Sequence, residues 1–279
     1  MKKIVVCYHK GCLDGFGGAY AAWKALGSSA DYVGLDHQEA VPPALKNKTI
    51  YFIDFCYPVP VMKKVVGTNK KVIVLDHHKS QEEAIYLASD FRFELDHSGS
   101  VIAWKYFHSG KKVPYLLQVI EDNDLFLFRN SETKRLIALL QYCDQTFSCF
   151  DQLARLLQTK KGRAEMLHDG KILQQAEDTT VARLVERGEK VVFEGFKVYA
   201  MNTSLFYSQS ANALSRLKKV PFGISWFYRE GKIHVSLRRS KAGVDVSVLA
   251  KKYGGGGHPG AAGFSFDFKG VFPWRTIKN

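Results

Sequence analysis

The sequence predicts an α/β protein: a mostly parallel sheet with flanking helices, then a helical linker, then a smaller α/β C-terminal domain. Three observations support this prediction. Before Pro114, short apolar runs typical of buried strands alternate with helix-like segments, which is the pattern of βαβ units. From there to about Arg187, apolar residues recur at the three- and four-residue spacing of helices. Beyond Gly188 the strand-like runs return. The predicted parts are residues 1–150, 151–187 and 188–279.

The first part contains five apolar runs that predict strands, with helix-like segments between them. The run over residues 71–75 is the clearest, because a continuous series of valine, isoleucine and leucine is typical of a buried parallel strand. Small residues over 17–26 allow a helix to pack closely on a sheet, and Pro58 suits the first turn of another helix. The predicted strands are residues 4–8, 31–35, 49–53, 71–75 and 91–95, and the predicted helices are 17–26, 58–66, 81–87 and 101–107.

The later parts change from helices back to strands. Asp122 and Asp124 fall in the gap after the first predicted helix of the middle part. In the last part, Arg229-Glu230-Gly231 separates two strand-like runs and predicts a hairpin, and a glycine-rich stretch over residues 254–264 follows a short helix. The predicted helices are residues 115–120, 133–142, 150–157, 163–185, 208–217 and 246–253, and the predicted strands are 190–194, 197–202, 222–228 and 232–238.

Composition narrows the class of protein. Hydrophobic residues make up 46% of the 279 residues, which supplies a sizeable core and argues against global disorder. The excess of 40 lysines and arginines over 27 acidic residues favours a polyanionic partner. Five cysteines without a Cys-x-x-Cys pair indicate reduced thiols. No apolar run reaches membrane-spanning length, and the N-terminal run stops at His9, too early for a signal peptide. We therefore expect a cytoplasmic protein with no membrane partner.

Side chains able to bind metals follow the predicted strands, at the sheet edge where α/β proteins bind ligands. Carboxylates and imidazoles together suit Mn²⁺, Mg²⁺, Zn²⁺ or Fe²⁺ better than Ca²⁺, which prefers oxygen ligands alone. The groups suffice for two ions, with Asp54 placed to bridge them, and two ions about 3.5–4 Å apart suit an in-line phosphoryl displacement. The residues are His9, Asp14, Asp54, Asp76, His77, His78 and Asp122.

An alternative role exists for each aspartate, because each strand end precedes a helix and aspartate is a favoured N-cap. The combination of four aspartates with three histidines favours the metal site over four separate caps. The two adjacent histidines differ in role, because side chains alternate faces along a strand. One of His77 and His78 can ligate a metal while the other reaches towards the substrate.

The glycine run at residues 254–257 provides a second functional signal. Successive glycines allow a backbone to approach a phosphate closely and to form an anion-binding nest. The run lacks the lysine of a Walker loop, and a strand-like segment follows it where a dinucleotide-binding motif requires a helix. The alternative is a flexible loop before a strand. His258 within the loop, and Arg238-Arg239 at the end of a predicted strand, favour phosphate or nucleotide binding.

These motifs, in this order, resemble the DHH phosphoesterase superfamily with its DHH-associated C-terminal domain. The resemblance rests on Leu75-Asp76-His77-His78, on the aspartates that precede it, on Ser98-Gly99-Ser100 and on Gly-Gly-Gly-His-x-x-Ala-Ala-Gly-Phe over 255–264. It covers nearly the whole chain. It implies the branch that contains nanoRNases, phosphoadenosine-phosphate phosphatases, cyclic- and linear-dinucleotide phosphodiesterases and RecJ-like exonucleases. The implied reaction is hydrolysis of phosphodiester bonds in short oligonucleotides or (di)nucleotides by in-line attack of a metal-activated hydroxide.

The resemblance also implies roles for individual residues. In these roles, His78 contacts the scissile phosphate and acts as general acid. Asp76 orients the histidines without itself binding a metal. The C-terminal domain holds the substrate. Two divalent ions are expected, Mn²⁺ first and Mg²⁺ as the alternative, and Asp124 is the alternative to Asp122 as a ligand. The implied metal ligands are His9, Asp14, Asp54, His77 and Asp122, and the implied substrate-binding residues are Arg238, Gly256, Gly257 and His258.

Cys12 departs from the family pattern, whose first motif usually has aspartate at this position. A thiolate there would favour softer metals, or the first metal site is weak, with Asp36 or His37 as substitutes. The sequence leaves three alternatives to a nuclease: a degenerate nucleotide-binding sensor without turnover, an inorganic pyrophosphatase-like hydrolase, and a nucleic-acid-binding protein that uses its positive charge. RNA versus DNA, cleavage polarity and a homodimeric state are also left open.

Overall fold

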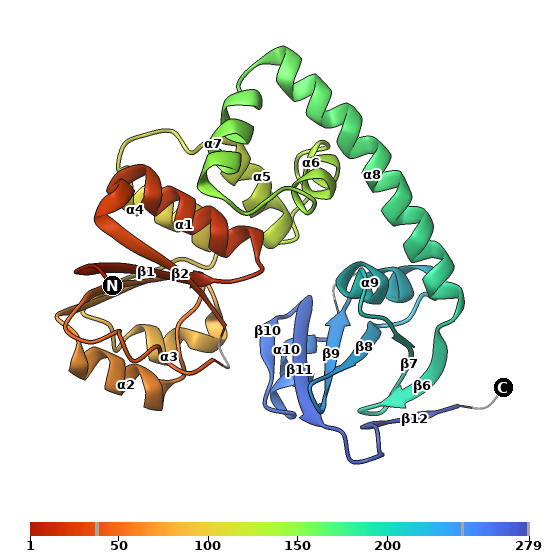
Figure 1. The fold of residues 1–279 in the computed structure, drawn as a ribbon. Coiled ribbons are helices and arrows are strands. Elements are labelled where there is room, and N and C mark those ends of the chain that lie inside the picture. The colour runs from red at the N-terminus through yellow and green to blue at the C-terminus, as the bar shows by residue number, and fades with distance from the viewer. Residues whose placement is uncertain (37–38, 241–242, 278–279) are drawn as a thin grey trace. The chain divides into compact units, whose positions relative to one another are not determined.

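The computed structural model describes residues 1–36, 39–240 and 243–277. They form two compact units, Met1–Gln174 and Gln175–Asn279 (Figure 1). In the described parts of the chain, no helix is both long and apolar enough to cross a membrane. The five cysteines are all free thiols, two of them fully buried.

The first unit is built on a five-stranded sheet in which every neighbouring pair of strands is parallel. The strand order is β2-β1-β3-β4-β5, so the chain moves first to one side of β1 and then to the other. The carboxyl ends of β1 and β3 thus flank a topological switch point, where open α/β sheets bind their ligands. The strands are β1 (Ile4–His9), β2 (Ala30–Leu35), β3 (Thr49–Ile53), β4 (Lys71–Asp76) and β5 (Asp90–Phe93).

Helices cover both faces of this sheet, because alternate strand residues point to opposite sides. Val6, Ile53 and Leu75 pack into a core on one face, whereas Phe52 and Val74 pack into a second core on the other. Figure 1 shows α1 and α4 on the first face and α2 and α3 on the second. The first core also includes α5 and α7. The helices are α1 (Leu13–Leu26), α2 (Val59–Thr68), α3 (Glu82–Ile85), α4 (Gly99–Phe107), α5 (Tyr115–Asp124) and α7 (Phe147–Leu156).

The predicted parallel α/β sheet is therefore observed, but two details of the helical region differ from the prediction. Phe150, Leu153 and Met166 belong to the core of the first unit, so this unit extends past residue 150. The division between units falls within the long helix α8 (Lys160–Glu186), which follows α6 (Thr133–Leu140) and α7. In addition, Asp122 and Asp124 lie inside α5 and not in a gap after it.

The second unit contains a seven-stranded mixed sheet in the order β10-β11-β9-β8-β7-β6-β12. Strands β7 and β8 are parallel, and the other neighbouring pairs are antiparallel. This unit also contains the C-terminal part of α8 and the helices α9 (Tyr207–Leu217) and α10 (Val246–Lys251). Its strands are β6 (Glu189–Phe193), β7 (Phe196–Asn202), β8 (Gly223–Arg229), β9 (Lys232–Arg238), β10 (Gly256–His258), β11 (Ala261–Asp267) and β12 (Trp274–Thr276).

The predicted hairpin at Glu230-Gly231 is confirmed. Strands β8 and β9 pair around it, and both residues have positive φ angles, 53° and 82°, as a tight turn matching the twist of a hairpin requires. Strand β12 was not predicted. It is short, and it is held mainly by Trp274, which packs into the aromatic core of this unit.

Candidate metal centre and substrate-binding residues

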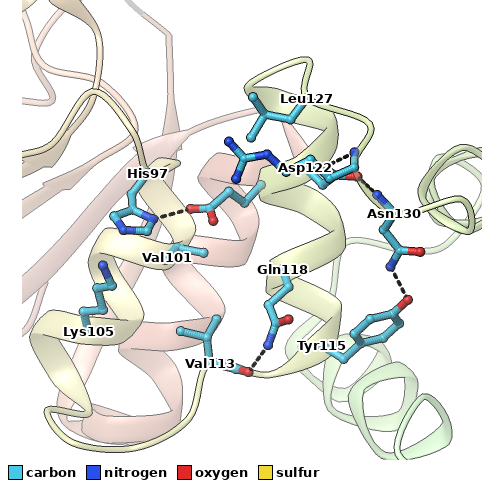
Figure 2. A pocket seen from close by; sticks show the side chains of 11 residues that line it. His97, Val101, Lys105, Val113, Tyr115, Gln118, Asp122, Leu127 and Asn130 are labelled. Atoms are coloured by element: carbon cyan, nitrogen blue, oxygen red, sulfur yellow. Dashed lines mark hydrogen bonds and ion pairs between the residues drawn. The ribbon is translucent and has the colours of Figure 1, made fainter.

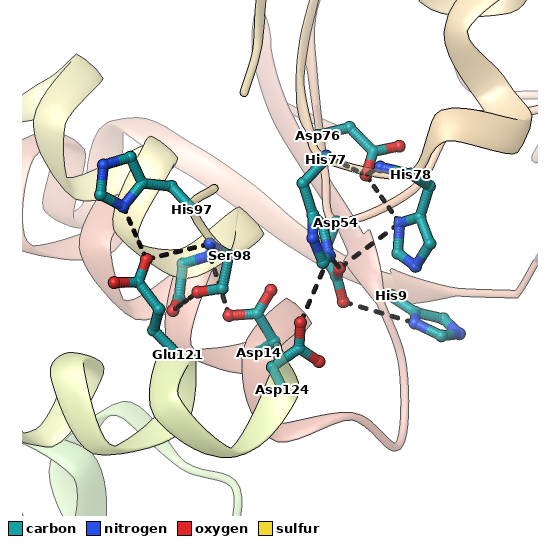
Figure 3. A network of polar contacts seen from close by, with 11 residues as sticks. His9, Asp14, Asp54, Asp76, His77, His78, His97, Ser98, Glu121 and Asp124 are labelled. Carbon is teal, nitrogen blue, oxygen red and sulfur yellow. Dashed lines mark hydrogen bonds and ion pairs between the residues drawn. The ribbon is translucent and has the colours of Figure 1, made fainter. Parts of the chain in front are cut away.

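Side chains of the types that can bind metals gather in the first unit at the carboxyl end of the central strands (Figure 3). His9 is the last residue of β1, Asp54 directly follows β3, and Asp76 is the last residue of β4. His77 and His78 come next in the chain. Since β1, β3 and β4 are neighbours in one parallel sheet, their ends meet at the switch point.

Asp54 occupies the middle of this group and faces a histidine on each side. Its Oδ1 lies 3.4 Å from Nε2 of His77, and its Oδ2 lies 3.4 Å from Nδ1 of His9. The backbone has a φ of 63°, and its amide donates a hydrogen bond to the Leu75 carbonyl. Burial alone would raise the pKa of Asp54, but hydrogen bonds from His77 and His9 hold it well below the usual value. Asp54 is thus an ionised carboxylate whose two oxygens face different partners, as a bridging ligand requires.

Two more carboxylates approach His77 from helices. Asp14 lies in the first turn of α1 and Asp124 is the last residue of α5. Ligand atoms of Asp14, His77 and Asp124 lie within 4.8 Å of one another. Burial and the neighbouring carboxylate of Asp54 raise the pKa of Asp14 well above its usual value. Burial, reinforced by Asp54, raises the pKa of Asp124 to about 6.

These carboxylates fit a divalent cation. The Oδ2 atoms of Asp14 and Asp124 are buried and accept no hydrogen bond from any described residue, and the nearest cationic group to the Asp124 oxygen is Nε2 of His77, at 3.4 Å. A buried carboxylate without compensation is costly, and the cost rises when further carboxylates converge on the same place. A dication would compensate this charge, and its preferred ligands in proteins are the carboxylate and imidazole groups found here. The donor set therefore matches the predicted cofactor class.

A second candidate ligand set includes the thiol that departs from the family pattern. His9, Cys12 and Asp54 place their ligand atoms within 4.8 Å of one another. Cys12 directly precedes the first turn of α1, and this position places its thiol near the ends of the strands. Burial raises the pKa of the Cys12 thiol well above its usual value, and the carboxylates of Asp54, Asp124 and Asp14 raise it further. Burial lowers the pKa of His9, but the hydrogen bond and charge of Asp54, with a smaller contribution from Asp36, raise it above its usual value, whereas His37 lies outside the described residues.

Asp76 supports the two histidines. Its Oδ1 lies 2.8 Å from Nδ1 of His78 and accepts hydrogen bonds from the backbone amides of His77 and His78. This contact fixes the orientation of the His78 imidazole, so that its Nε2 faces away from Asp76. Burial lowers the pKa of His78, but the charge of Asp76 and this hydrogen bond outweigh burial and raise it to about 9. His78 is thus positioned as a protonated imidazole.

Asp122 is not brought into the candidate centre, and this corrects its prediction as a metal ligand. Residues two apart on a helix point about 200° away from each other, so only one of Asp122 and Asp124 can face the cluster. The Asp122 carboxylate instead accepts hydrogen bonds from the amides of Arg129 and Asn130 and from the Thr133 hydroxyl. Asp124, the alternative in the sequence analysis, takes the place in the cluster.

The start of α4 supports the centre from the helical side. The amide of Ser100 donates to Oδ1 of Asp14 at 3.0 Å, which leaves Oδ2 of Asp14 for the cluster. Ser98 Oγ lies 3.0 Å from Ser100 Oγ, and the Ser98 amide donates to Oε2 of Glu121. Figure 3 shows this chain of contacts from Glu121 to Asp14. Glu121 was missed by sequence reasoning, because nothing in its local pattern distinguishes it from a solvated helix residue.

Glu121 also lines a cavity of about 420 Å³ beside α4 and α5 (Figure 2). Its Oε2 lies 2.9 Å from Nδ1 of His97, and Lys105 and Arg129 line the same cavity. Of the described ligand candidates, the cavity includes Asp122 but not Asp14, His77 or Asp124. The cavity is therefore separate from the candidate centre, although the Glu121 contacts connect the two.

In the second unit, the predicted substrate-binding residues lie in one row of the sheet. Ala261 pairs with His258 on one side and with Arg238 on the other, so their side chains share a face. The Arg238 guanidinium donates to Ser208 Oγ and to the carbonyl of Ala262. These contacts hold Arg238 on this face together with His258.

The glycine run is only partly a loop. Gly256 and Gly257 form the edge strand β10 with His258, and Gly257 has a φ of 131°. A β-carbon at Gly257 would lie 2.5 Å from the Ala261 carbonyl oxygen, and one at Gly255 would lie 2.1 Å from that of Gly263. Close packing on β11 thus explains the glycines at 255 and 257 without any ligand.

Comparisons with known proteins agree with this arrangement. Residues 197–271 match the family model of the DHHA1 domain. Uncharacterized protein R106 of Acanthamoeba polyphaga mimivirus is 27% identical over 300 residues, which span 98% of this chain and 70% of that protein. The bifunctional oligoribonuclease and PAP phosphatase NrnA of Bacillus subtilis (strain 168) is 26% identical over 218 residues, 73% of this chain and 64% of that protein.

A solved structure shows the same fold. The pGpG-specific phosphodiesterase PggH from Vibrio cholerae matches with a TM-score of 0.52 and 15% identity, covering 96% of this chain and 94% of that one. Both units of the chain are thus matched in order by a protein of this architecture.

Proposed function

We infer that the chain is a member of the DHH phosphoesterase superfamily, and on this premise we propose that it is a metal-dependent phosphodiesterase acting on short oligonucleotides or dinucleotides. One observation carries the proposal: Asp14, Asp54, His77 and Asp124 converge at the switch point of the parallel sheet. Similarity to the oligoribonuclease NrnA supports nucleotide substrates. The chain spans 64% of that protein, so the substrate class is part of the proposal.

Two sets of side chains would hold the ions. Asp14, His77 and Asp124 form one set, His9 and Cys12 belong to the other, and Asp54 faces both. When bound, divalent ions would supply positive charge near the phosphoryl oxygens. They would also lower the pKa of a bound water molecule, so that hydroxide is available at neutral pH. We propose Mn²⁺ as the principal metal, with Mg²⁺ as the alternative, because the donors combine carboxylates with imidazoles.

The residues of the chain supply the proton and the orientation. His78, with its pKa raised to about 9, is protonated at neutral pH and can give a proton to the leaving oxygen. Asp76 keeps the imidazole oriented through the 2.8 Å contact to Nδ1. In the second unit, Arg238 and His258 project from one face of the sheet, and we propose that they hold the phosphate or sugar of the substrate.

The test is product analysis with the purified protein and Mn²⁺. The substrates are end-labelled RNA and DNA of two to about twenty nucleotides, cyclic dinucleotides, phosphoadenosine phosphate and pyrophosphate. We expect mononucleotide release, fastest from the shortest oligomers, and the labelled end gives the direction of cleavage. Asp54→Asn should abolish turnover while the circular dichroism spectrum stays unchanged. No hydrolysis of any substrate with Mn²⁺, Mg²⁺, Zn²⁺ or Fe²⁺ would overturn the proposal.

A second candidate function has a specific observation in its favour. Cys12 stands among the ligands where the family pattern has aspartate, which is what a degenerate nucleotide-binding sensor would show. Such a sensor would bind nucleotides in the same assay without converting them. The pyrophosphatase-like alternative has less support, because residues 197–271 match the DHHA1 domain.

A further inference from the structure

The segment after Asp124 holds two phenylalanines in an uncommon backbone conformation. Phe126 and Phe128 have φ angles of 58° and 48°, in the left-handed region that bulky residues rarely adopt. Residues in this region persist only where the surrounding structure imposes the conformation, and they concentrate at functional sites. The segment begins directly after Asp124, a residue of the candidate metal centre. It therefore lies next to that centre in the chain.

Asp122 imposes this conformation. Its carbonyl oxygen accepts hydrogen bonds from the amides of Leu127 and Phe128, at 3.0 and 3.3 Å. Its carboxylate accepts from the next two amides, Arg129 and Asn130, at 2.8 and 3.2 Å. Four successive amides are thus bound by one residue. The segment is therefore a fixed turn, and Asp122 is its positioning residue.

The turn exposes aromatic and apolar surface. The Phe126 side chain is 50% exposed and Leu127 is 38% exposed. The rings of Phe126 and Phe128 meet edge to face with centroids 4.8 Å apart, which buttresses Phe126 from one side. The ammonium of Lys134 lies 5.2 Å from the centroid of the Phe128 ring. The exposed ring of Phe126 is thus held in place by Phe128, and Phe128 in turn lies beside a positive charge.

We propose that Phe126 is a stacking surface for the nucleobase of the bound substrate, an inference that rests on the proposed function. Two peptide units separate its Cα from that of Asp124, so the two Cα atoms lie no more than about 7 Å apart. A base attached to a phosphate at the metal centre is within reach of the ring. Stacking tolerates every base, because each has a π-face. The turn therefore selects nucleotides over phosphates that lack a base, such as pyrophosphate.

The test compares two probes that differ by the base. Adenosine 5′-monophosphate and ribose 5-phosphate are titrated by calorimetry, with Mn²⁺ present, into the wild-type chain and Phe126→Ala. Loss of one aromatic stack is expected to weaken adenosine monophosphate binding about 5- to 150-fold. Ribose 5-phosphate should bind both proteins equally. Phe126→Trp should retain the wild-type affinity for adenosine monophosphate, and this variant keeps the test valid if Phe126→Ala folds poorly.

Phe91→Ala is the matched control, since Phe91 is also exposed and lies on the edge strand β5 of the same unit. It should leave both affinities unchanged. Equal weakening of the two probes by Phe126→Ala, or no weakening of either, would overturn the inference. The binding readout is independent of turnover. Base-dependent binding without hydrolysis would contradict the proposed function and support the stacking surface. Hydrolysis without base-dependent binding would support the proposed function and contradict the stacking surface.

Discussion

Gly99 lies against Asp54 so closely that a β-carbon at position 99 would be 2.8 Å from Cβ of Asp54. The same β-carbon would lie 3.0 Å from Oδ2 of Asp14, the buried oxygen that accepts no hydrogen bond from the described residues. The helix start that carries the Ser100 amide to Asp14 therefore depends on the absence of a side chain at position 99. Two candidate metal ligands, Asp14 and Asp54, are thus in close contact with the first residue of α4.

Gly99→Ala is therefore expected to disturb the centre more than the fold. The extra methyl has to displace either Asp54 or the first turn of α4, and both changes move ligand oxygens. We expect Mn²⁺ affinity to fall by at least about tenfold, comparable with losses at residues that support metal ligands. Calorimetric titration of Mn²⁺ measures this change.

Gly67→Ala is the matched control for this substitution. Gly67 lies in α2, and a β-carbon there meets no heavy atom of a described residue within 4 Å. Alanine at a helical position should stabilise the protein by up to about 1 kcal/mol and leave Mn²⁺ binding unchanged. Equal Mn²⁺ affinity in Gly99→Ala and wild type would contradict the role assigned to this contact.

Asp124 and Asp122 should separate metal binding from stability. Asp124→Asn removes a carboxylate whose pKa is raised to about 6 by burial and by Asp54, so it should weaken Mn²⁺ binding without destabilising the metal-free protein. Asp122→Ala removes the acceptor of the Arg129 and Asn130 amides and should cost about 2–4 kcal/mol of unfolding free energy. Urea denaturation and metal titration of both variants measure the two effects. Loss of Mn²⁺ binding in Asp122→Ala, with normal Mn²⁺ binding in Asp124→Asn, would show that Asp122 is the ligand.

Metal binding should release protons. Burial lowers the pKa of His77, but hydrogen bonding to Asp54 and the charges of Asp124 and Asp14 outweigh it and raise the value to about 10. A metal ligates the neutral imidazole, so below that pH a bound metal displaces a proton. Affinity for Mn²⁺ should thus rise with pH, by up to tenfold per unit for each proton displaced. Calorimetry at pH 7 in two buffers of different ionisation enthalpy counts the protons, and an identical heat in both would exclude the displacement.

The sheet that carries these groups was predictable because its information is local. Val72, Ile73 and Val74 are buried on both faces of the sheet, and such continuous aliphatic runs identify parallel strands. The short polar segments at the strand ends were equally visible, which placed His9, Asp54 and His77 correctly at one edge. The role of each residue is a prediction from the family resemblance.

Features that depend on packing between distant residues were not predictable. Asp122 and Asp124 carry the same side chain, and only the orientation of α5 decides which faces the cluster. The glycines at 255 and 257 resemble a phosphate-binding loop, yet their close packing on β11 appears only once the strands pair. Phe150 joins the first core because α7 folds back on α1, so a boundary at residue 150 divides a packed unit.

The last prediction concerns Cys12, the residue that departs from the family pattern. Its thiol lies with His9 and Asp54 in one candidate ligand set, and thiolates favour softer ions than carboxylates do. Cys12→Asp should therefore weaken Zn²⁺ binding relative to Mn²⁺ binding, changing the ratio of the Zn²⁺ and Mn²⁺ dissociation constants by about tenfold or more. Competition titrations with a chelating dye measure this ratio.

Cys143→Ser, which changes a free thiol outside the cluster, controls for general effects of thiol removal. An unchanged ratio in Cys12→Asp would show that the thiol is not a ligand. A changed ratio together with faster hydrolysis under Mn²⁺ would show that Cys12 sets the metal preference of an active centre. Replacing one thiol by a carboxylate could not raise the rate of hydrolysis unless the other ligands of the centre were already in place.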